Sequence, residues 1–152
     1  MKGMTLIVKT ITALLIGFIL LFGFYVILTG HLSPGGGFAG GVVLAAGLLL
    51  VILAFGADAV KERIGHRMAI LWESLGAIGF LAVAIMGFIT GAFFAQFLTP
   101  NLAFKLSAAG SIPVSNVAIG LKVGAGLFGA FLMLAAFRET EKADRERGEG
   151  DQ

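Results

Sequence analysis

Residues Thr10–Ala57 form one uninterrupted apolar run, TITALLIGFILLFGFYVILTGHLSPGGGFAGGVVLAAGLLLVILAFGA. Its 48 residues include no Lys, Arg, Asp or Glu. A helix needs about 20 mostly apolar residues to cross the ~30 Å hydrocarbon layer of a bilayer. The run is therefore too long for one membrane span and has the length of two. We predict that the polar, glycine-rich segment Thr29–Gly37 separates them.

The composition of the whole chain also indicates a lipid environment. Of its 152 residues, 58% are apolar and 13% are charged, against about 45–50% and about 25% in ordinary soluble domains. The mean hydropathy is +0.98. A water-soluble domain of this length could not cover its surface with so few charges. We therefore predict an all-α integral membrane protein.

Four segments have the length and apolarity of a transmembrane helix. They form one predicted domain, residues 1–137, with spans at about 6–28, 36–56, 69–94 and 115–137. Ser33 and Pro34 are typical of an N-cap and a first helical residue, and Thr99-Pro100 predicts a short interfacial helix. The charged tail, residues 138–152, contains six acidic and four basic residues. We expect it to continue the last span as a solvated helix.

Basic residues near the ends of the spans predict the orientation, because Lys and Arg are enriched in cytoplasmic loops. They cluster at the N-terminus, in the segment Asp58–Met68 and in the tail. The glycine-rich hairpin has none, and the segment Phe97–Val114 has only Lys105. We therefore expect a multi-pass protein of the cell (cytoplasmic) membrane with both termini in the cytoplasm and the hairpin outside.

The 23 glycines predict close packing between the spans. In lipid no hydrophobic force brings helices together, so small residues that let backbones approach closely must contribute to their association. Four pairs have the small-xxx-small spacing that permits such contact: Gly36/Gly40, Gly37/Gly41, Gly87/Gly91 and Gly120/Gly124. We expect tightly packed helices with some faces left for other polypeptides.

Two ionisable residues interrupt the predicted spans. Lys122 lies about 12 Å from the outer end of the fourth span, and Glu73 lies about one turn into the third from the cytoplasmic side. A central Lys costs about 2.5–3.5 kcal/mol and usually faces protein or a water-lined interior. Both are therefore candidate ion-path residues. The alternatives are a structural ion pair or a Lys that extends to the interface, and, for Glu73, a loop cap or a pair with Arg67.

A direct pair between these two residues is not expected. The predicted span ends leave a vertical gap of roughly 13 Å between Glu73 and Lys122 in a ~30 Å layer, which two extended side chains barely bridge. No other acidic residue lies at membrane depth in the four predicted spans. We therefore predict that the partner of Lys122 belongs to another subunit.

The composition excludes several classes of site. Without cysteine, the chain has no disulfide and no thiolate metal site. His31 and His66 are predicted on opposite sides of the membrane and cannot jointly bind a metal or haem. We predict no cofactor, no metal site and no independent enzyme activity. His31 fits the role of a hydrogen-bonding loop residue better than that of a ligand, and it stays a third ion-path candidate.

The hairpin motif resembles a known signature. Its sequence, GHLSPGGGFAGG at residues 30–41, is similar to that of the B-type subunits of the multisubunit Mrp-type Na⁺/H⁺ antiporters and of their relatives in membrane-bound hydrogenase and sulfane reductase respiratory complexes. Trp72–Ala77, which opens the third span, agrees with it. The motif residues that carry the resemblance are Gly30, Pro34, Gly35, Gly36, Gly37, Gly40 and Gly41.

The resemblance implies a small membrane subunit without redox centres that helps to form a Na⁺ or H⁺ path beside larger antiporter-like subunits. Antiporter members are expected to have an acidic residue near the position of Lys122, which favours a member of a respiratory complex here. Two other functions stay open. In the first, the chain is a pure scaffold whose charges form structural ion pairs. In the second, it is a self-contained four-helix transporter, which fits less well because spans one and two lack acidic residues.

Overall fold

The computed structural model describes residues 4–32, 34–57, 60, 66–89 and 110–150. This part of the chain forms four long helices, α1 (Leu6–Thr29), α2 (Gly37–Phe55), α4 (His66–Ile89) and α5 (Ile112–Gly150). Each contains a segment long and apolar enough to cross a membrane, which is Arg67–Ile89 in α4 and Ile112–Arg138 in α5. The protein is therefore an all-helical, multi-pass membrane protein, as the sequence predicts.

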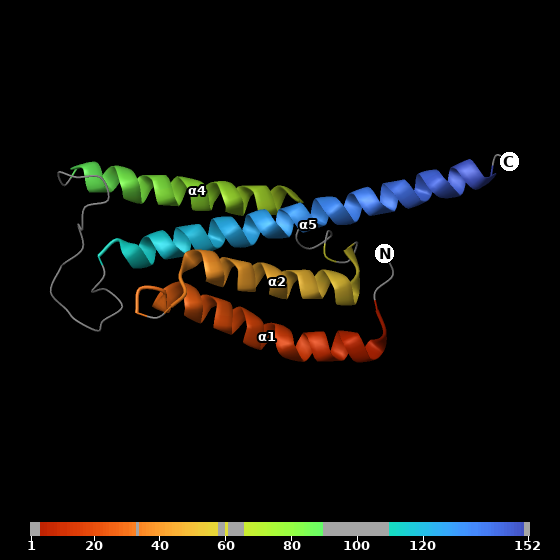
Figure 1. The fold of residues 1–152 in the computed structure, drawn as a ribbon, viewed down its shortest axis with the longest axis horizontal. Coiled ribbons are helices and arrows are strands. Elements are labelled where there is room, and N and C mark those ends of the chain that lie inside the picture. Colours follow the sequence, from red (N-terminus) through yellow and green to blue (C-terminus); the bar gives the residue numbers. More distant parts are fainter. Residues whose placement is uncertain (1–3, 33, 58–59, 61–65, 90–109, 151–152) are drawn as a thin grey trace.

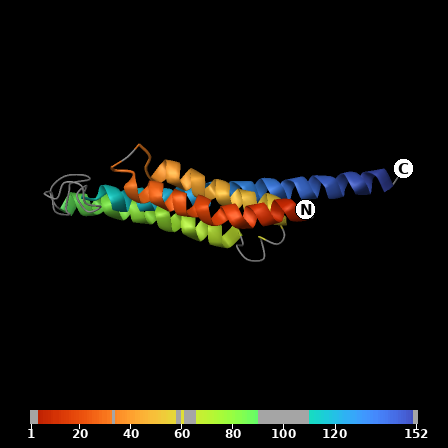
Figure 2. The ribbon, with the colours of Figure 1, turned by 90° about the horizontal axis from the view of Figure 1, so that it is seen from below.

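The helices lie side by side in the order α1, α2, α5, α4 (Figure 1). α5 contacts α2 on one side and α4 on the other, and α1 packs mainly on α2. α2 and α5 run in one direction, and α1 and α4 run in the opposite direction. Figure 2 shows the same four helices almost parallel when seen from below. This arrangement is a layer rather than a closed bundle, so α5 is the central element that the other helices share.

The layer leaves an unusually large apolar surface. The chain exposes 10215 Å², whereas a compact soluble protein of 15.8 kDa exposes roughly 7,300 Å². Large apolar side chains on α1, including Leu6, Phe18 and Leu21, are more than two-thirds exposed. Lipid tails are as apolar as these side chains. Both faces of the layer therefore suit lipid or other membrane proteins.

Glycine closes the hairpin between α1 and α2. Gly36 caps α2 with φ 124°, a conformation that glycine adopts far more readily than other residues. Gly30 lies so close that a side chain there would collide with the Gly36 Cα atom. α2 thus begins at Gly37, inside the motif, and the prediction that Pro34 is the first helical residue is wrong. Ser33 lies outside the described residues.

Two glycine pairs bring α2 and α5 together. A Cβ at Gly41 would lie 2.7 Å from the Gly120 carbonyl oxygen, and one at Gly124 would lie 3.4 Å from the Gly41 carbonyl oxygen. Gly37 lies directly against the backbone of Asn116, one turn before Gly120. The predicted packing role of the pairs Gly37/Gly41 and Gly120/Gly124 is therefore confirmed.

The other two predicted glycine pairs behave differently. Gly40 packs on α1, where a Cβ would lie 2.8 Å from the Gly23 carbonyl oxygen, while Gly36 is the cap that precedes the helix. Gly87 is buried on α4, and Gly91 lies outside the described residues. α2 thus presents one glycine face to α1 and another to α5, which explains its central place beside α5.

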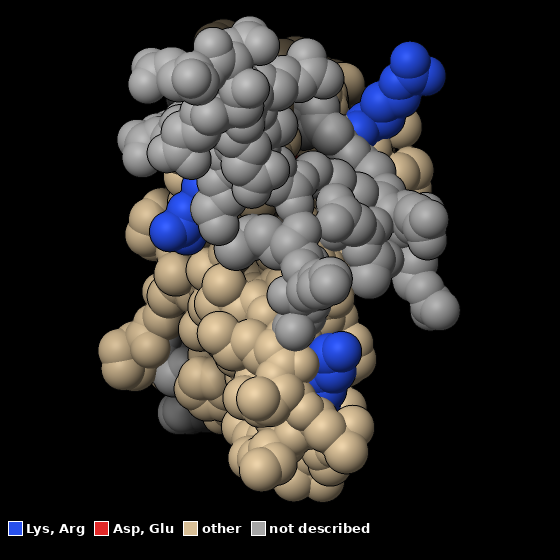
Figure 3. All heavy atoms as spheres, turned by 90° about the vertical axis from the view of Figure 1, so that its right-hand side faces the viewer, with Lys and Arg blue, Asp and Glu red and all other residues tan. Residues whose placement is uncertain are grey.

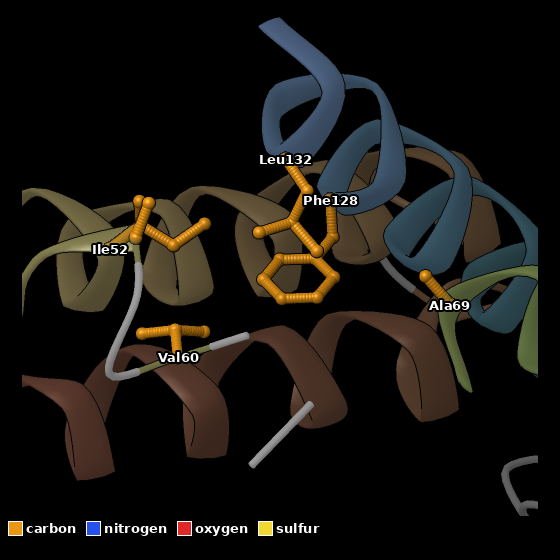
Figure 4. Close-up of a cluster of buried hydrophobic side chains, with 6 residues drawn as sticks. Ile52, Val60, Ala69, Phe128 and Leu132 are labelled. Atoms are coloured by element: carbon orange, nitrogen blue, oxygen red, sulfur yellow. The ribbon is translucent and has the colours of Figure 1, made fainter. Parts of the chain in front are cut away.

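A hydrophobic cluster ties the connection after α2 to the rest of the layer (Figure 4). Phe128 and Leu132 of α5 are 3% and 2% exposed, and they pack with Ile52 at the end of α2. Val60, in the connection, and Ala69 of α4 belong to the same cluster. The cluster therefore fixes one end of the layer, where α2 ends and α4 begins.

The boundaries of the last two spans differ from the predicted ones. α4 begins at His66 and α5 at Ile112, each three residues before the predicted start. Residues 90–94 of the predicted third span, and the predicted interfacial helix at Thr99-Pro100, lie outside the described residues. α5 extends over 39 residues, or about 58 Å, so the tail continues the last span as a helix, as predicted.

Candidate functional site: an ion pair at membrane depth

Lys122 and Glu73 form an ion pair between α5 and α4. The Lys122 Nζ atom lies 3.7 Å from the Glu73 Oε1 atom. The prediction that the two residues lie too far apart to pair is therefore wrong, and Lys122 has an acidic partner within its own chain. Glu73 pairs with Lys122 and not with Arg67, which was the alternative partner.

The positions of the helix ends explain this result. Glu73 lies about 10 Å along α4 from His66, and Lys122 lies about 15 Å along α5 from Ile112. In a ~30 Å layer, the vertical gap falls to about 5 Å instead of 13 Å. Flexible Lys and Glu side chains easily bridge a gap of this size.

Small residues allow α4 and α5 to meet closely at the pair. A Cβ at Gly76 would lie 2.7 Å from the Lys122 backbone nitrogen and 2.8 Å from the Ala118 carbonyl oxygen. One turn further along α5, a Cβ at Gly126 would lie 3.5 Å from the Glu73 Cδ atom. The Glu73 carboxylate thus lies over Gly126, in space that a larger residue would occupy. A Cβ alone would make an ordinary contact there, but a larger side chain at 126 would compete with the carboxylate for this space.

The pair is not enclosed by its own chain. The side chains of Lys122 and Glu73 are 49% and 44% exposed, although both lie inside candidate membrane spans. Charged groups within a membrane almost always face a bundle interior, a water-filled cavity or another charge. The pair satisfies one of these needs internally, and its open half requires water or another protein.

His31 lies at the other candidate site, in the hairpin. Both of its ring nitrogens are buried, and neither has a hydrogen-bond partner among the described residues. A buried polar atom without a partner costs about 1–3 kcal/mol, so such atoms usually indicate a missing water, ion or neighbouring group. His31 lies in the hairpin between α1 and α2, apart from the Lys122–Glu73 pair, which lies between α4 and α5. The side chain of His66 lies outside the described part of the structure.

Asn116 belongs to the hairpin site, although the sequence analysis did not select it. A Cβ at Gly30 would lie 3.0 Å from its Nδ2 atom, and one at Gly36 would lie 3.8 Å from its Oδ1 atom. The sequence feature that could have identified Asn116 is its position four residues before Gly120, because this spacing places it on the face of α5 that packs on α2. The carboxamide places a polar group of α5 against the glycine-rich turn. In the described part of the chain, His, Asp and Glu form no cluster of three that could bind a metal ion.

Within the residues that the structure describes, four membrane-capable helices packed through glycine and an ion pair at membrane depth define a small multi-pass membrane protein. Residues 7–129 match the family described as a domain related to the MnhB subunit of the Na⁺/H⁺ antiporter. The chain belongs to this family. The resemblance that the hairpin motif indicated is thereby confirmed.

Similar proteins come from bacteria and archaea. The chain is 32% identical over 119 residues to the "Putative antiporter subunit mnhB2" of Staphylococcus aureus, covering 78% of this chain and 82% of that protein. It is 36% identical over 120 residues to the "Uncharacterized protein MJ1307" of Methanocaldococcus jannaschii, covering 74% of this chain and 45% of that one.

A solved structure supports the same fold. A chain of the membrane-bound sulfane sulfur reductase (MBS), an archaeal respiratory membrane complex, matches with a TM-score of 0.71 and 33% sequence identity. The match covers 84% of this chain and 59% of that one. The chain therefore spans less than two-thirds of this archaeal neighbour and of MJ1307, but most of mnhB2.

Proposed function

We propose that this chain is a small, non-redox membrane subunit of an Mrp-type cation/proton antiporter module and helps to form a Na⁺ or H⁺ path within a multisubunit complex. Its family and its similarity to a chain of a respiratory membrane complex support this proposal. The parent complex is either an antiporter or a respiratory oxidoreductase. In either case the chain acts as an accessory subunit with both termini on the cytoplasmic side of the cell membrane.

The half-exposed ion pair carries the proposal. Lys122 and Glu73 contact each other, and nearly half of each side chain is exposed. A passing ion or water can therefore reach either charged group and replace its partner. A neighbouring subunit that covers this side of α4 and α5 would enclose the charges and any water beside them. In such a site, entry of a cation near Glu73 or loss of a proton from Lys122 would change the net charge of the pair. The chain thereby supplies one wall of the ion path.

Transport by the assembled complex tests the proposal. We would compare Lys122→Met, Glu73→Gln and the double variant in inside-out membrane vesicles, following Na⁺-dependent proton movement with a pH-sensitive dye. Arg67→Gln is the matched control, because Arg67 is an exposed basic residue on the same helix as Glu73. Assembly is measured separately, by the amount of tagged chain that co-purifies with its neighbours.

The ion-path function predicts that all three variants at the pair lose most transport while assembly and the Arg67 control stay normal. A pure scaffold predicts normal transport in the double variant, in which neither charge is left uncompensated. Transport at wild-type rate in both single variants would contradict the proposal. Ion transport by the purified chain alone would instead indicate a self-contained transporter.

A further inference from the structure

An apolar groove opens between α2 and α5 at the end of the layer where both spans end. Its volume is about 320 Å³, which lies within the range of about 300–1,000 Å³ that ligand pockets usually have. Its lining includes Leu49, Leu53, Phe131 and Leu134, together with Met4 and Arg138. The groove is distinct from the ion pair, because neither Lys122 nor Glu73 lines it.

Arg138 supplies a positive charge at one defined depth. It is the last residue of the α5 span, it is exposed, and in the described part of the chain it has no ion pair. Lys9 and Arg67, near the starts of α1 and α4, lie at the same end of the layer. Figure 3 views this end, where the described Lys and Arg side chains lie well apart from one another. The guanidinium group of Arg138, which lines the groove, is therefore available to bind an anion.

We propose that the groove binds an acyl chain of an anionic phospholipid whose phosphate pairs with Arg138. The apolar walls suit a hydrocarbon chain, and a residue at the end of a span lies at the level of the lipid headgroups. Arginine binds phosphate oxygens through two parallel hydrogen bonds. Basic pockets between membrane helices bind anionic headgroups in this way. The groove is thus a lipid site independent of the proposed ion path.

Spin-labelled lipids test this site directly. The purified full chain is reconstituted in phosphatidylcholine vesicles with a trace of phosphatidylglycerol or phosphatidylcholine labelled on the acyl chain, and the immobilised fraction is measured. One basic residue near the surface favours an anionic lipid by about fivefold. We expect that preference in the wild type, its loss in Arg138→Gln and its retention in Arg67→Gln. Leu53→Trp, which fills the groove, should release both lipids, whereas Leu81→Trp on α4 should not.

Three results would overturn the proposal. Equal losses in Arg138→Gln and Arg67→Gln would mean that the positive end attracts anionic lipid without a defined site. Unchanged lipid immobilisation in Leu53→Trp would mean that the groove is not occupied. Phosphatidylglycerol selectivity in the purified chain, with no anionic lipid retained by the purified complex, would mean that a neighbouring subunit fills the groove. None of these results bears on transport by the ion pair.

Discussion

Gly76→Ala tests the close approach of α4 and α5 beside the ion pair. The added Cβ would lie 2.7 Å from the Lys122 nitrogen and 2.8 Å from the Ala118 oxygen. Non-bonded heavy atoms pack best at about 3.5–4.0 Å. Both atoms belong to the backbone, so no side-chain rotation relieves the collision. α4 must therefore move away from α5 by about 0.8 Å or more, which also stretches the Lys122–Glu73 contact.

The matched control is Gly79→Ala on the same helix. There the new Cβ would lie 3.6 Å from the Ala118 Cβ, an ordinary contact. Both changes alter the helix propensity equally, so the difference between the variants isolates the collision. Overpacking of this kind costs about 1–3 kcal/mol. The folded-to-unfolded ratio of Gly76→Ala should therefore be about 5 to 150 times lower than that of Gly79→Ala.

Reversible unfolding of the purified full chain measures this difference. The chain is titrated with dodecyl sulfate in mixed micelles, and helix content is followed by circular dichroism. We expect the Gly76→Ala transition at a lower dodecyl sulfate fraction than that of Gly79→Ala or the wild type. Equal transitions for the two alanine variants would refute the close contact, and with it the placement of Lys122 against α4.

Three further predictions concern the rest of the layer. Gly41→Leu, which places a side chain against the Gly120 oxygen, should destabilise the chain by about 1–3 kcal/mol in the same titration, whereas Gly17→Leu, with nothing within 4 Å of its Cβ, should not; equal effects would rule out glycine packing of α2 on α5. His31→Phe removes two buried nitrogens that have no partner among the described residues, so the purified chain should lose no stability; a loss above about 1 kcal/mol would show that the ring is hydrogen-bonded. Because the chain has no cysteine, a single cysteine at the exposed Leu32 should react with a membrane-impermeant thiol reagent added outside intact cells, and one added to the tail should not; the reverse pattern would invert the proposed orientation.

Much of the fold follows from local sequence properties. Hydropathy and charge place the four spans, because lipid requires long apolar helices whose backbone groups are all satisfied internally. The helical tail and the family also follow from the sequence, the latter from the hairpin motif. Glycine spacing identified Gly37/Gly41 and Gly120/Gly124 as packing pairs. It could not tell which helices they join, because any two glycine faces fit one another.

The ion pair was missed for a geometric reason. An error of three residues in the start of α4 and of α5 moves each charge by about 4.5 Å, and the two errors add. That sum separates a gap that two extended side chains barely bridge from one that they bridge easily. The useful signal was Gly126, one turn after Lys122, which leaves room for the Glu73 carboxylate. Asn116 was missed because a single amide near the end of a span carries no charge.

Water access to position 122 in the assembled complex tests the central claim most directly. Lys122→Cys is compared with Ile78→Cys, whose native side chain is 63% exposed on α4, by reaction with a charged thiol reagent in native membranes. If the ion pair lines a hydrated path, the cysteine at 122 reacts, Na⁺ slows that reaction, and the cysteine at 78 stays unreactive in lipid. Equal lack of reaction at both positions would place the pair in a dry interface and contradict its role in ion movement.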